Sequence, residues 1–298
     1  MKEAAQSGLF HPYDDLIPFL APLCVSGNCT WEPYRTLQVC SKTANITDRL
    51  TYTPLEYESG DVNKTSPRLV NVTLPNGAYL TSSPFRPMNI TYLYQASDDI
   101  SVANHSIAFL DLPNIMNTAI ANQFLIYKYD KQERYGDPFL PHYAIEIMFY
   151  WCVGEYSTEV KNGIPSSKPV QISTDVKTLN GTIPVSPDIF PNPMIKPRFP
   201  QISALVLSGG KDKQENYTVD SPSRVALSDY LMAMLKGETY TSSFSPTSDG
   251  AALITSALYD PITIGNVSKT MALQQGIDSQ LKTVDTVITN IATSLTNK

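Results

Sequence analysis

The chain of 298 residues carries a net charge of −6 and is 42% hydrophobic. This hydrophobic fraction supports a folded core and argues against a disordered chain, which needs low hydrophobicity and high net charge. The acidic balance, with no two adjacent Lys or Arg residues, argues against a nucleic-acid binder. No apolar run approaches the ~18 residues of a membrane-spanning helix, and residues 1–8 lack the apolar core of a signal peptide.

The N-terminal part is rich in cysteine, and an even number of cysteines predicts two disulfides with three possible connectivities. The four cysteines are Cys24, Cys29, Cys40 and Cys152. No Cys-x-x-Cys pair occurs, and the three histidines, His11, His105 and His142, lie far apart without ligand spacing. We therefore expect no metal site and no cofactor.

Residues 50–182 have the pattern of β-strands, and residues 143–151 form the clearest one. The odd-numbered positions from Tyr143 to Val153 are wholly apolar, whereas the even-numbered face, which includes Glu146, is mixed. This predicts a central strand with one side on the core. Turn sequences mark loops at residues 75–77, 136–138 and 162–163.

A proline-rich stretch divides the chain. Residues 184–200 contain six prolines, which fix φ and remove backbone donors, so we expect a stiff connector there. The predicted fold class is α+β: a β-rich antiparallel part over residues 1–183 and a helical part over residues 201–298.

Three helices are expected in the C-terminal part. Ser221 provides an N-cap with Pro222 at the first helical position, and Gly237 provides a stop. A short helix covers residues 251–259. The last helix carries one apolar stripe, which is consistent either with docking on the core or with a juxtamembrane stalk. The stripe consists of Leu273, Ile277, Leu281, Val284, Ile288, Ile291 and Leu295.

N-glycosylation sequons are more frequent than chance allows. The content of Asn, Ser and Thr predicts about three, whereas nine occur, at Asn28, Asn45, Asn63, Asn71, Asn89, Asn104, Asn180, Asn216 and Asn266. Around Asn71 and Asn89, strand alternation places both polar residues of the sequon on one face. Asn28 is the weakest candidate, because a disulfide at Cys29 would compete with glycosylation. The sequons predict an extracellular glycoprotein, although no signal peptide is visible.

The segment over residues 24–41 resembles the Cys-x-x-Gly-Asn-Cys-Thr-Trp … Leu-x-Val-Cys-Ser signature of a fungal family of multi-pass membrane proteins, known as a domain of unknown function. Residues 150–153, 235–237 and 292–296 also resemble it. The resemblance implies an ectodomain on the extracellular face of a membrane, attached through membrane helices that flank it.

The resemblance also implies a disulfide pattern. Family members usually have further cysteines where Thr43 and Ile147 stand here, and the joint absence of both suggests that they are partners. The pairing implied for this chain is Cys40 with Cys152, which leaves Cys24 with Cys29 in a short loop.

No catalytic motif stands out. Gly-x-Ser-x-Gly and the phosphate-binding Gly-x-x-x-x-Gly-Lys are both absent. We expect a non-enzymatic domain that interacts with a cell-wall glycan or a protein, with aromatic candidates at Tyr92, Tyr94, Tyr127 and Tyr129.

The alternative is a secreted hydrolase of wall polysaccharide, which needs two facing carboxylates. Its candidates are Asp98, Asp99, Glu146 and Glu155.

Overall fold

The computed structural model describes residues 23–54, 70–73, 79–81, 88–95, 120–129, 141–174, 176–180, 202–209, 215–239 and 269–296. The strands are β1 (Cys29–Thr30), β2 (Tyr34–Asn45), β3 (Thr51–Pro54), β4 (Val70–Thr73), β5 (Tyr79–Thr81), β6 (Met88–Gln95), β7 (Ile120–Tyr129), β8 (Pro141–Lys161), β9 (Ile164–Ser173), β10 (Val176–Asn180), β11 (Ile202–Gly209), β12 (Glu215–Asp220) and β13 (Gly237–Thr239). The helices are η2 (Thr47–Arg49), α2 (Ser221–Leu235) and α4 (Lys269–Thr296).

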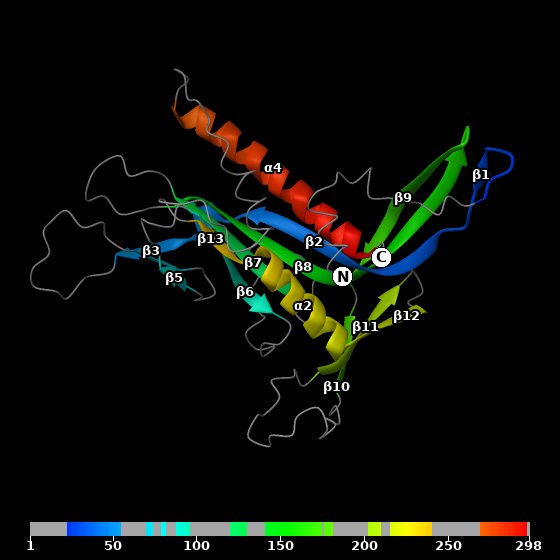
Figure 1. Ribbon diagram of the computed structural model, residues 1–298, viewed down its shortest axis with the longest axis horizontal. Helices are drawn as coiled ribbons and strands as arrows, with labels where there is room; N and C mark the ends of the chain where they lie inside the picture. The colour runs from blue at the N-terminus through cyan, green and yellow to red at the C-terminus, as the bar shows by residue number, and fades with distance from the viewer. Residues whose placement is uncertain are drawn as a thin grey trace, which may run out of the picture.

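Strand β8 organises the main antiparallel sheet. Its first half lies between β7 and β2. Its second half pairs with β9 on one side and with the rest of β2 and then β1 on the other, while β6 and β13 extend the sheet beyond β7. Two smaller antiparallel sheets have the orders β10-β11-β12 and β3-β4-β5. Antiparallel sheets with packed helices confirm the predicted α+β class (Figure 1).

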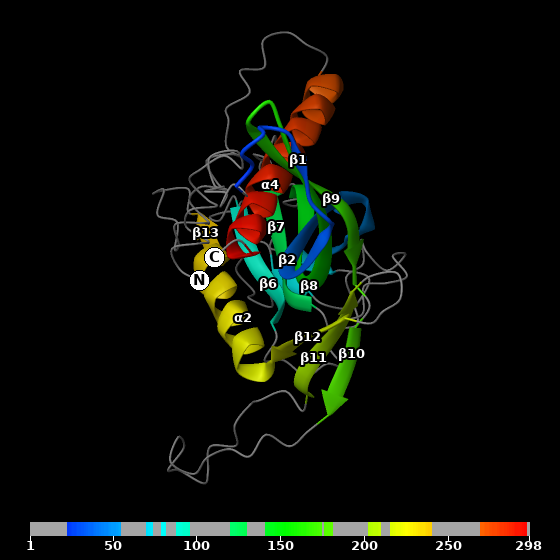
Figure 2. The ribbon, with the colours of Figure 1, turned by 90° about the vertical axis from the view of Figure 1, so that its right-hand side faces the viewer.

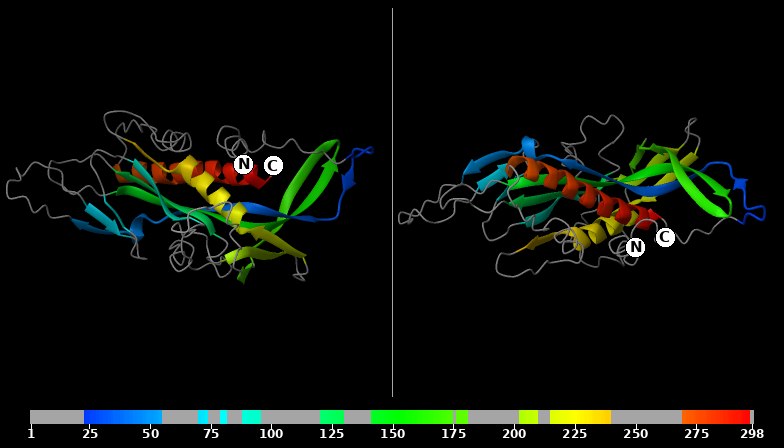
Figure 3. Two further views of the ribbon diagram at one scale, coloured as in Figure 1. Left: turned by 60° about the horizontal axis from the view of Figure 1, so that its bottom comes forward. Right: turned by 90° about the horizontal axis from the view of Figure 1, so that it is seen from above.

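The two α-helices, α2 and α4, cover the same face of the main sheet (Figures 2 and 3). The last helix runs along β2, and α2 lies against β6 and β7. The shared core joins residues of both parts: Val39, Ile90, Ala121, Phe124, Ile126, Ile145, Ile147, Phe149, Leu227, Leu231, Met234, Leu235, Val284, Ile288, Ile291 and Ala292. The β-rich and helical parts therefore fold around one core, and β11, β12 and β13 lie in the part expected to be helical.

The second face of β8 corrects the prediction that only one side of this strand lies on the core. Residues 144–150 are buried on both faces, including Glu146, which accepts a hydrogen bond from Gln123 Nε2. A separate apolar cluster of Cys40, Ile120, Met148, Tyr150 and Cys152 explains the burial on this second face.

The start of α2 differs from the prediction. The N-cap is Asp220, whose Oδ1 accepts a hydrogen bond from the backbone N–H of Ser223 at 2.9 Å, whereas Ser221 is already helical. A carboxylate caps a helix well because it satisfies an amide that has no partner within the helix. The helix ends where predicted, with Lys236 as the C-cap and Gly237 directly after it, and Gly237 is also the first residue of β13.

The apolar stripe of α4 is docked on the core, the first of the two alternatives that its sequence left open. Val284, Ile288 and Ile291 are fully buried, and Leu281 and Leu295 pack against the same core. The side chains of Leu273 and Ile277, the proline-rich stretch and residues 251–259 lie outside the described part. Within the described ranges, no helix combines the length and hydropathy needed to cross a membrane.

Candidate functional site

A hairpin arm projects from the main sheet where β8 continues beyond β7 and pairs with β9 (Figure 1). Its turn is the predicted Asn162-Gly163 dipeptide, with φ of 52° and 78°. Two successive residues in the left-handed region define the hairpin turn that matches the twist of the strands. Asn and Gly adopt this conformation at little energetic cost, so the sequence directly determines the end of the arm.

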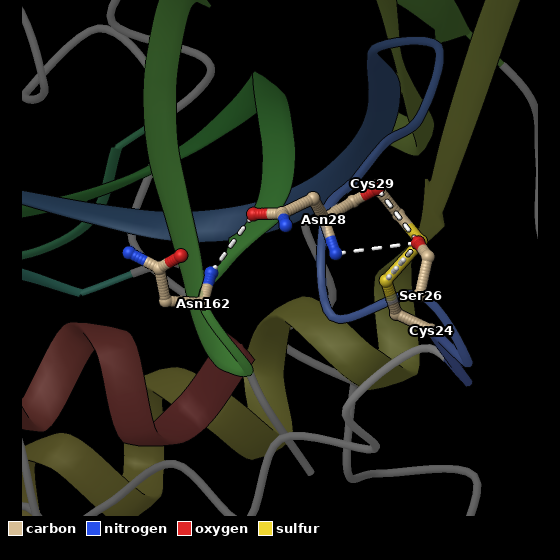
Figure 4. Close-up of a disulfide and its surroundings, with 5 residues drawn as sticks. All are labelled: Cys24, Ser26, Asn28, Cys29 and Asn162. Atoms are coloured by element: carbon tan, nitrogen blue, oxygen red, sulfur yellow. Dashed lines mark hydrogen bonds between the residues drawn. A yellow bond between two sulfur atoms is a disulfide. The ribbon is translucent and has the colours of Figure 1, made fainter.

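The cysteine-rich segment closes over this turn. Gly27 C=O accepts the N–H of Gly163 at 2.9 Å. Asn28 Oδ1 accepts the N–H of Asn162 at 3.0 Å, as Figure 4 shows. The backbone N–H of Trp31 donates to Thr158 C=O at 3.2 Å. The Gly-Asn-Cys-Thr-Trp motif thus attaches the N-terminal segment to the hairpin. Residues 23–31 with Asn162 and Gly163 are called the arm tip below.

A disulfide between Cys24 and Cys29 closes the loop of the arm tip. Inside it, Gly27 N–H donates to Cys24 C=O, and Gly27 has a φ of 70°, which glycine tolerates best. Ser26 Oγ donates to the C=O of Asn28 at 2.9 Å and contacts both sulfurs, at 3.7 and 3.5 Å (Figure 4). The covalent bond and these hydrogen bonds hold the loop in one shape.

Apolar side chains point outward at the arm tip and beside it. Leu23 is 91% exposed, Val25 93% and Ile164 70%. The nearest charges along the hairpin belong to an ion pair, with Lys161 Nζ 2.8 Å from Glu159 Oε2. The hydrogen bond from Lys161 holds the pKa of Glu159 below its ordinary value. The end of the arm is therefore apolar and locally neutral.

The second disulfide joins Cys40 of β2 to Cys152 of β8, 112 residues apart in sequence. Both pairs are those that the resemblance implies. The register also places Thr43 directly opposite Ile147, the two positions where that resemblance implies a further pair of cysteines. Sequence spacing alone does not reveal this, because the register connects strands more than 100 residues apart.

A buried amide lies beside this disulfide. Gln38 Nε2 donates to Cys40 Sγ at 3.4 Å, and Gln38 Oε1 accepts from the hydroxyl of Tyr156 at 2.6 Å. The Tyr156 ring stacks on Tyr34, with centroids 5.7 Å apart. The amide fits here because residue 154 is glycine: a Cβ there would lie 2.7 Å from Gln38 Nε2.

An ionic cluster connects the main sheet to the β10-β11-β12 sheet. Arg35 Nε donates to Glu155 Oε2 at 2.7 Å, and Arg35 Nη1 lies 3.4 Å from Glu215 Oε1. The hydroxyl of Tyr217 donates to Glu215 Oε2 at 2.8 Å. The hydrogen bond to Glu155 raises the pKa of Arg35 further above its already high value.

The cluster borders a shallow depression that is lined by Arg35, Val153, Glu155, Gln171 and Ser173. Of the two hydrolase candidates in the described part, Glu146 and Glu155, it is Glu155 that shares an arginine with a second carboxylate, that of Glu215. Both carboxylates bind the same guanidinium, with Glu155 on β8 of the main sheet and Glu215 on β12 of the smaller sheet. The cluster thus holds the two sheets together.

The sequons are distributed over several elements. Asn28, Asn45 and Asn216 are exposed, and Asn71 is half-buried opposite the fully buried Val72, as strand alternation predicts. Asn45 Oδ1 accepts hydrogen bonds from N–H and Oγ1 of Thr47, at 3.0 and 2.6 Å, so its Nδ2 is the atom left for a glycan. The side chains of Asn89 and Asn180 lie outside the described residues, as do Asn63, Asn104 and Asn266.

Other candidates from the sequence fall largely outside the described part. This holds for His11, His105, Asp98 and Asp99, and for the side chains of His142, Tyr92, Tyr94, Tyr127 and Tyr129. Among the residues that the structure does describe, no group of three or more His, Cys, Asp or Glu side chains is placed to hold a metal ion.

No family model, curated protein or solved structure matches this chain. The family relationship suggested by residues 24–41 thus stays a hypothesis.

Proposed function

We propose that this chain is an extracellular, N-glycosylated domain of a fungal membrane-anchored protein, and that it acts through contacts at the cell surface or cell wall and not through catalysis. The observation that carries this proposal is the pairing of all four cysteines in two disulfides. Disulfides persist in oxidising compartments and are rare in the cytosol, where thiols are kept reduced.

Two further features support the location. Nine sequons occur in the chain, and three of those in the described part have exposed asparagines: Asn28, Asn45 and Asn216. The membrane anchor and the fungal source rest on the resemblance of residues 24–41 alone. The contact role rests on the arm tip, which presents a rigid, uncharged surface at one end of the molecule.

The location is tested by expressing the gene in a fungal host and digesting the product with an N-glycosidase. We expect the digest to increase electrophoretic mobility and mass spectrometry to find glycans on Asn45 and Asn216. Thr218→Val removes the sequon of Asn216, whereas Thr218→Ser keeps it, so only the first variant should lose that glycan. A product without any mobility shift would overturn the extracellular location.

A further inference from the structure

The arm tip combines features that together suit contact with a lipid surface. Leu23, Val25 and Ile164 expose most of their surface at the end of the molecule where β1 and the β8–β9 hairpin meet (Figure 1). Single exposed aliphatic residues are ordinary on protein surfaces. Here Leu23 and Val25 flank Cys24, so that Val25 lies within the loop that the disulfide closes and Leu23 lies directly before it, and the third directly follows the hairpin turn.

Charge is the second observation. Residues 23–31 contain no charged side chain in a protein whose net charge is −6. The neighbouring Lys161 and Glu159 neutralise each other at 2.8 Å. The next charged residues along the two segments, Glu32 and Lys168, are exposed and of opposite sign. Burying a charge in an apolar phase is costly unless it is paired, so an uncharged end enters such a phase more easily than a charged surface does.

Backbone hydrogen bonding is the third observation. The N–H groups of Gly27, Asn28, Asn162 and Gly163 all donate within the arm tip. Backbone groups that enter the apolar part of a bilayer must have such internal partners, because water is scarce there. A loop that needed water to satisfy these donors would resist insertion.

The edge of β9 that faces away from β8 is poorly suited to pairing with a strand of another protein. The two-residue turn makes Lys161 and Ile164 a hydrogen-bonded pair, so Pro165 and Pro169 occupy positions whose N–H would point away from β8. Proline has no N–H, which blocks strand addition there.

We propose that the arm tip and the adjacent Ile164 insert shallowly into a zwitterionic lipid bilayer, with the side chains of Leu23, Val25 and Ile164 at the boundary between the headgroups and the acyl chains. The inference rests on the extracellular, membrane-facing location proposed above and adds the lipid surface as the ligand of the arm. It also requires Asn28 to lack a glycan, because a sugar on this exposed residue would hold the loop away from the lipid.

The test is flotation of the purified, secreted full-length chain with phosphatidylcholine vesicles. We expect the wild-type protein to float with the vesicles and Leu23→Ser/Val25→Ser to lower the partition coefficient at least tenfold, since each change removes an aliphatic contact with lipid. The matched control is Val170→Ser/Ile172→Ser, which changes two exposed aliphatic residues of β9, 57% and 51% exposed, away from the turn. This control should stay within about twofold of the wild type.

Three outcomes would overturn the inference: no flotation of the wild type, equal losses in both variants, or a glycan on Asn28. Equal thermal stability of the two variants would show that a loss does not reflect misfolding. A protein that carries glycans on Asn45 and Asn216 but does not float would refute the lipid ligand and leave the extracellular location standing. Absence of all glycans would refute the location instead.

Discussion

The missing side chain of Gly154 allows the amide of Gln38 to lie across β8. There the amide bridges the Cys40 sulfur and the Tyr156 hydroxyl, and it is almost fully buried. A Cβ at residue 154 would come within 2.7 Å of both Gln38 and Tyr156. One residue therefore controls the packing beside the long-range disulfide.

We predict that Gly154→Ala lowers the free energy of unfolding by about 1–3 kcal/mol, the usual range for overpacking a tightly filled site. Urea denaturation with the disulfides intact measures this change. The comparison is Gly163→Ala, where no atom lies within 4 Å of the added Cβ but φ is 78°. That variant should lose about 1–2 kcal/mol through backbone strain alone. Unchanged stability of Gly154→Ala would mean that Gln38 moves aside freely.

Among the elements, α2 depends on a charged cap. Hydrogen bonds from the Ser223 hydroxyl and backbone N–H hold the pKa of Asp220 below its ordinary value. A carboxylate with a depressed pKa in the folded state stabilises the protein above its unfolded pKa, near 3.9. This contribution disappears as the pH falls through the lower, folded value.

We therefore predict that Asp220→Ala costs about 1 kcal/mol of stability at pH 7, and that this cost shrinks as the pH falls through the folded pKa of Asp220, because protonation removes the charged part of the cap. Asp220→Asn should retain the uncharged part of the cap at every pH, because its amide oxygen still accepts from Ser223. Chemical denaturation of the three proteins at pH 7 and at a pH below the folded pKa of Asp220 provides the comparison. An Asp220→Ala defect of the same size at both pH values would mean that the charge of the carboxylate does not contribute to the cap.

The two disulfides should differ in their effect on stability. The loop-entropy model assigns about 5 kcal/mol to a closed loop the size of that between Cys40 and Cys152, but only about 2 kcal/mol to the short loop of Cys24 and Cys29. We predict that Cys40→Ala/Cys152→Ala destabilises the protein far more than Cys24→Ser/Cys29→Ser. Guanidinium denaturation of both double variants checks this. Similar losses would show that the arm tip contributes more to the fold than its loop length suggests.

Exposure separates the two disulfides as well. Cys152 is fully buried and Cys40 nearly so, whereas Cys24 and Cys29 are half-buried at the arm tip. Access is one determinant of thiol–disulfide exchange. The short loop is therefore the part of the fold that a mild reductant reaches first.

At the scale of the whole molecule, sequence patterns among neighbouring residues predicted the structure, whereas contacts between distant segments could not be predicted from the sequence. Alternation over residues 143–151 and the Asn162-Gly163 dipeptide correctly indicate a strand and its turn, because both depend on neighbouring residues. The Arg35–Glu155–Glu215 cluster depends on how three strands align across 180 residues, and no local signal encodes that alignment. The burial of Glu146 could not be predicted from the sequence either, because its hydrogen-bond partner Gln123 lies on another strand.

The shared core leads to a prediction about the two halves of the chain. Leu227, Leu231 and Leu235 of α2 and Ile288 and Ile291 of α4 are almost completely buried against the main sheet. A fragment of residues 1–183 lacks this cover and exposes the apolar face that Ile145, Ile147 and Phe149 present to both helices. Burial of this face is a dominant stabilising term, and without it the sheet does not offset its conformational entropy.

We predict that the 1–183 fragment, made under oxidising conditions, lacks a near-ultraviolet circular dichroism signal and binds a hydrophobic dye. The full chain should show a signal and unfold in one transition when followed through both its helices and its aromatic residues. Ile288→Ala in the full chain is the graded control, with an expected loss of about 2–5 kcal/mol. A fragment that unfolds cooperatively on its own would show that the β-rich part is an independent domain, despite the core that it shares with both helices.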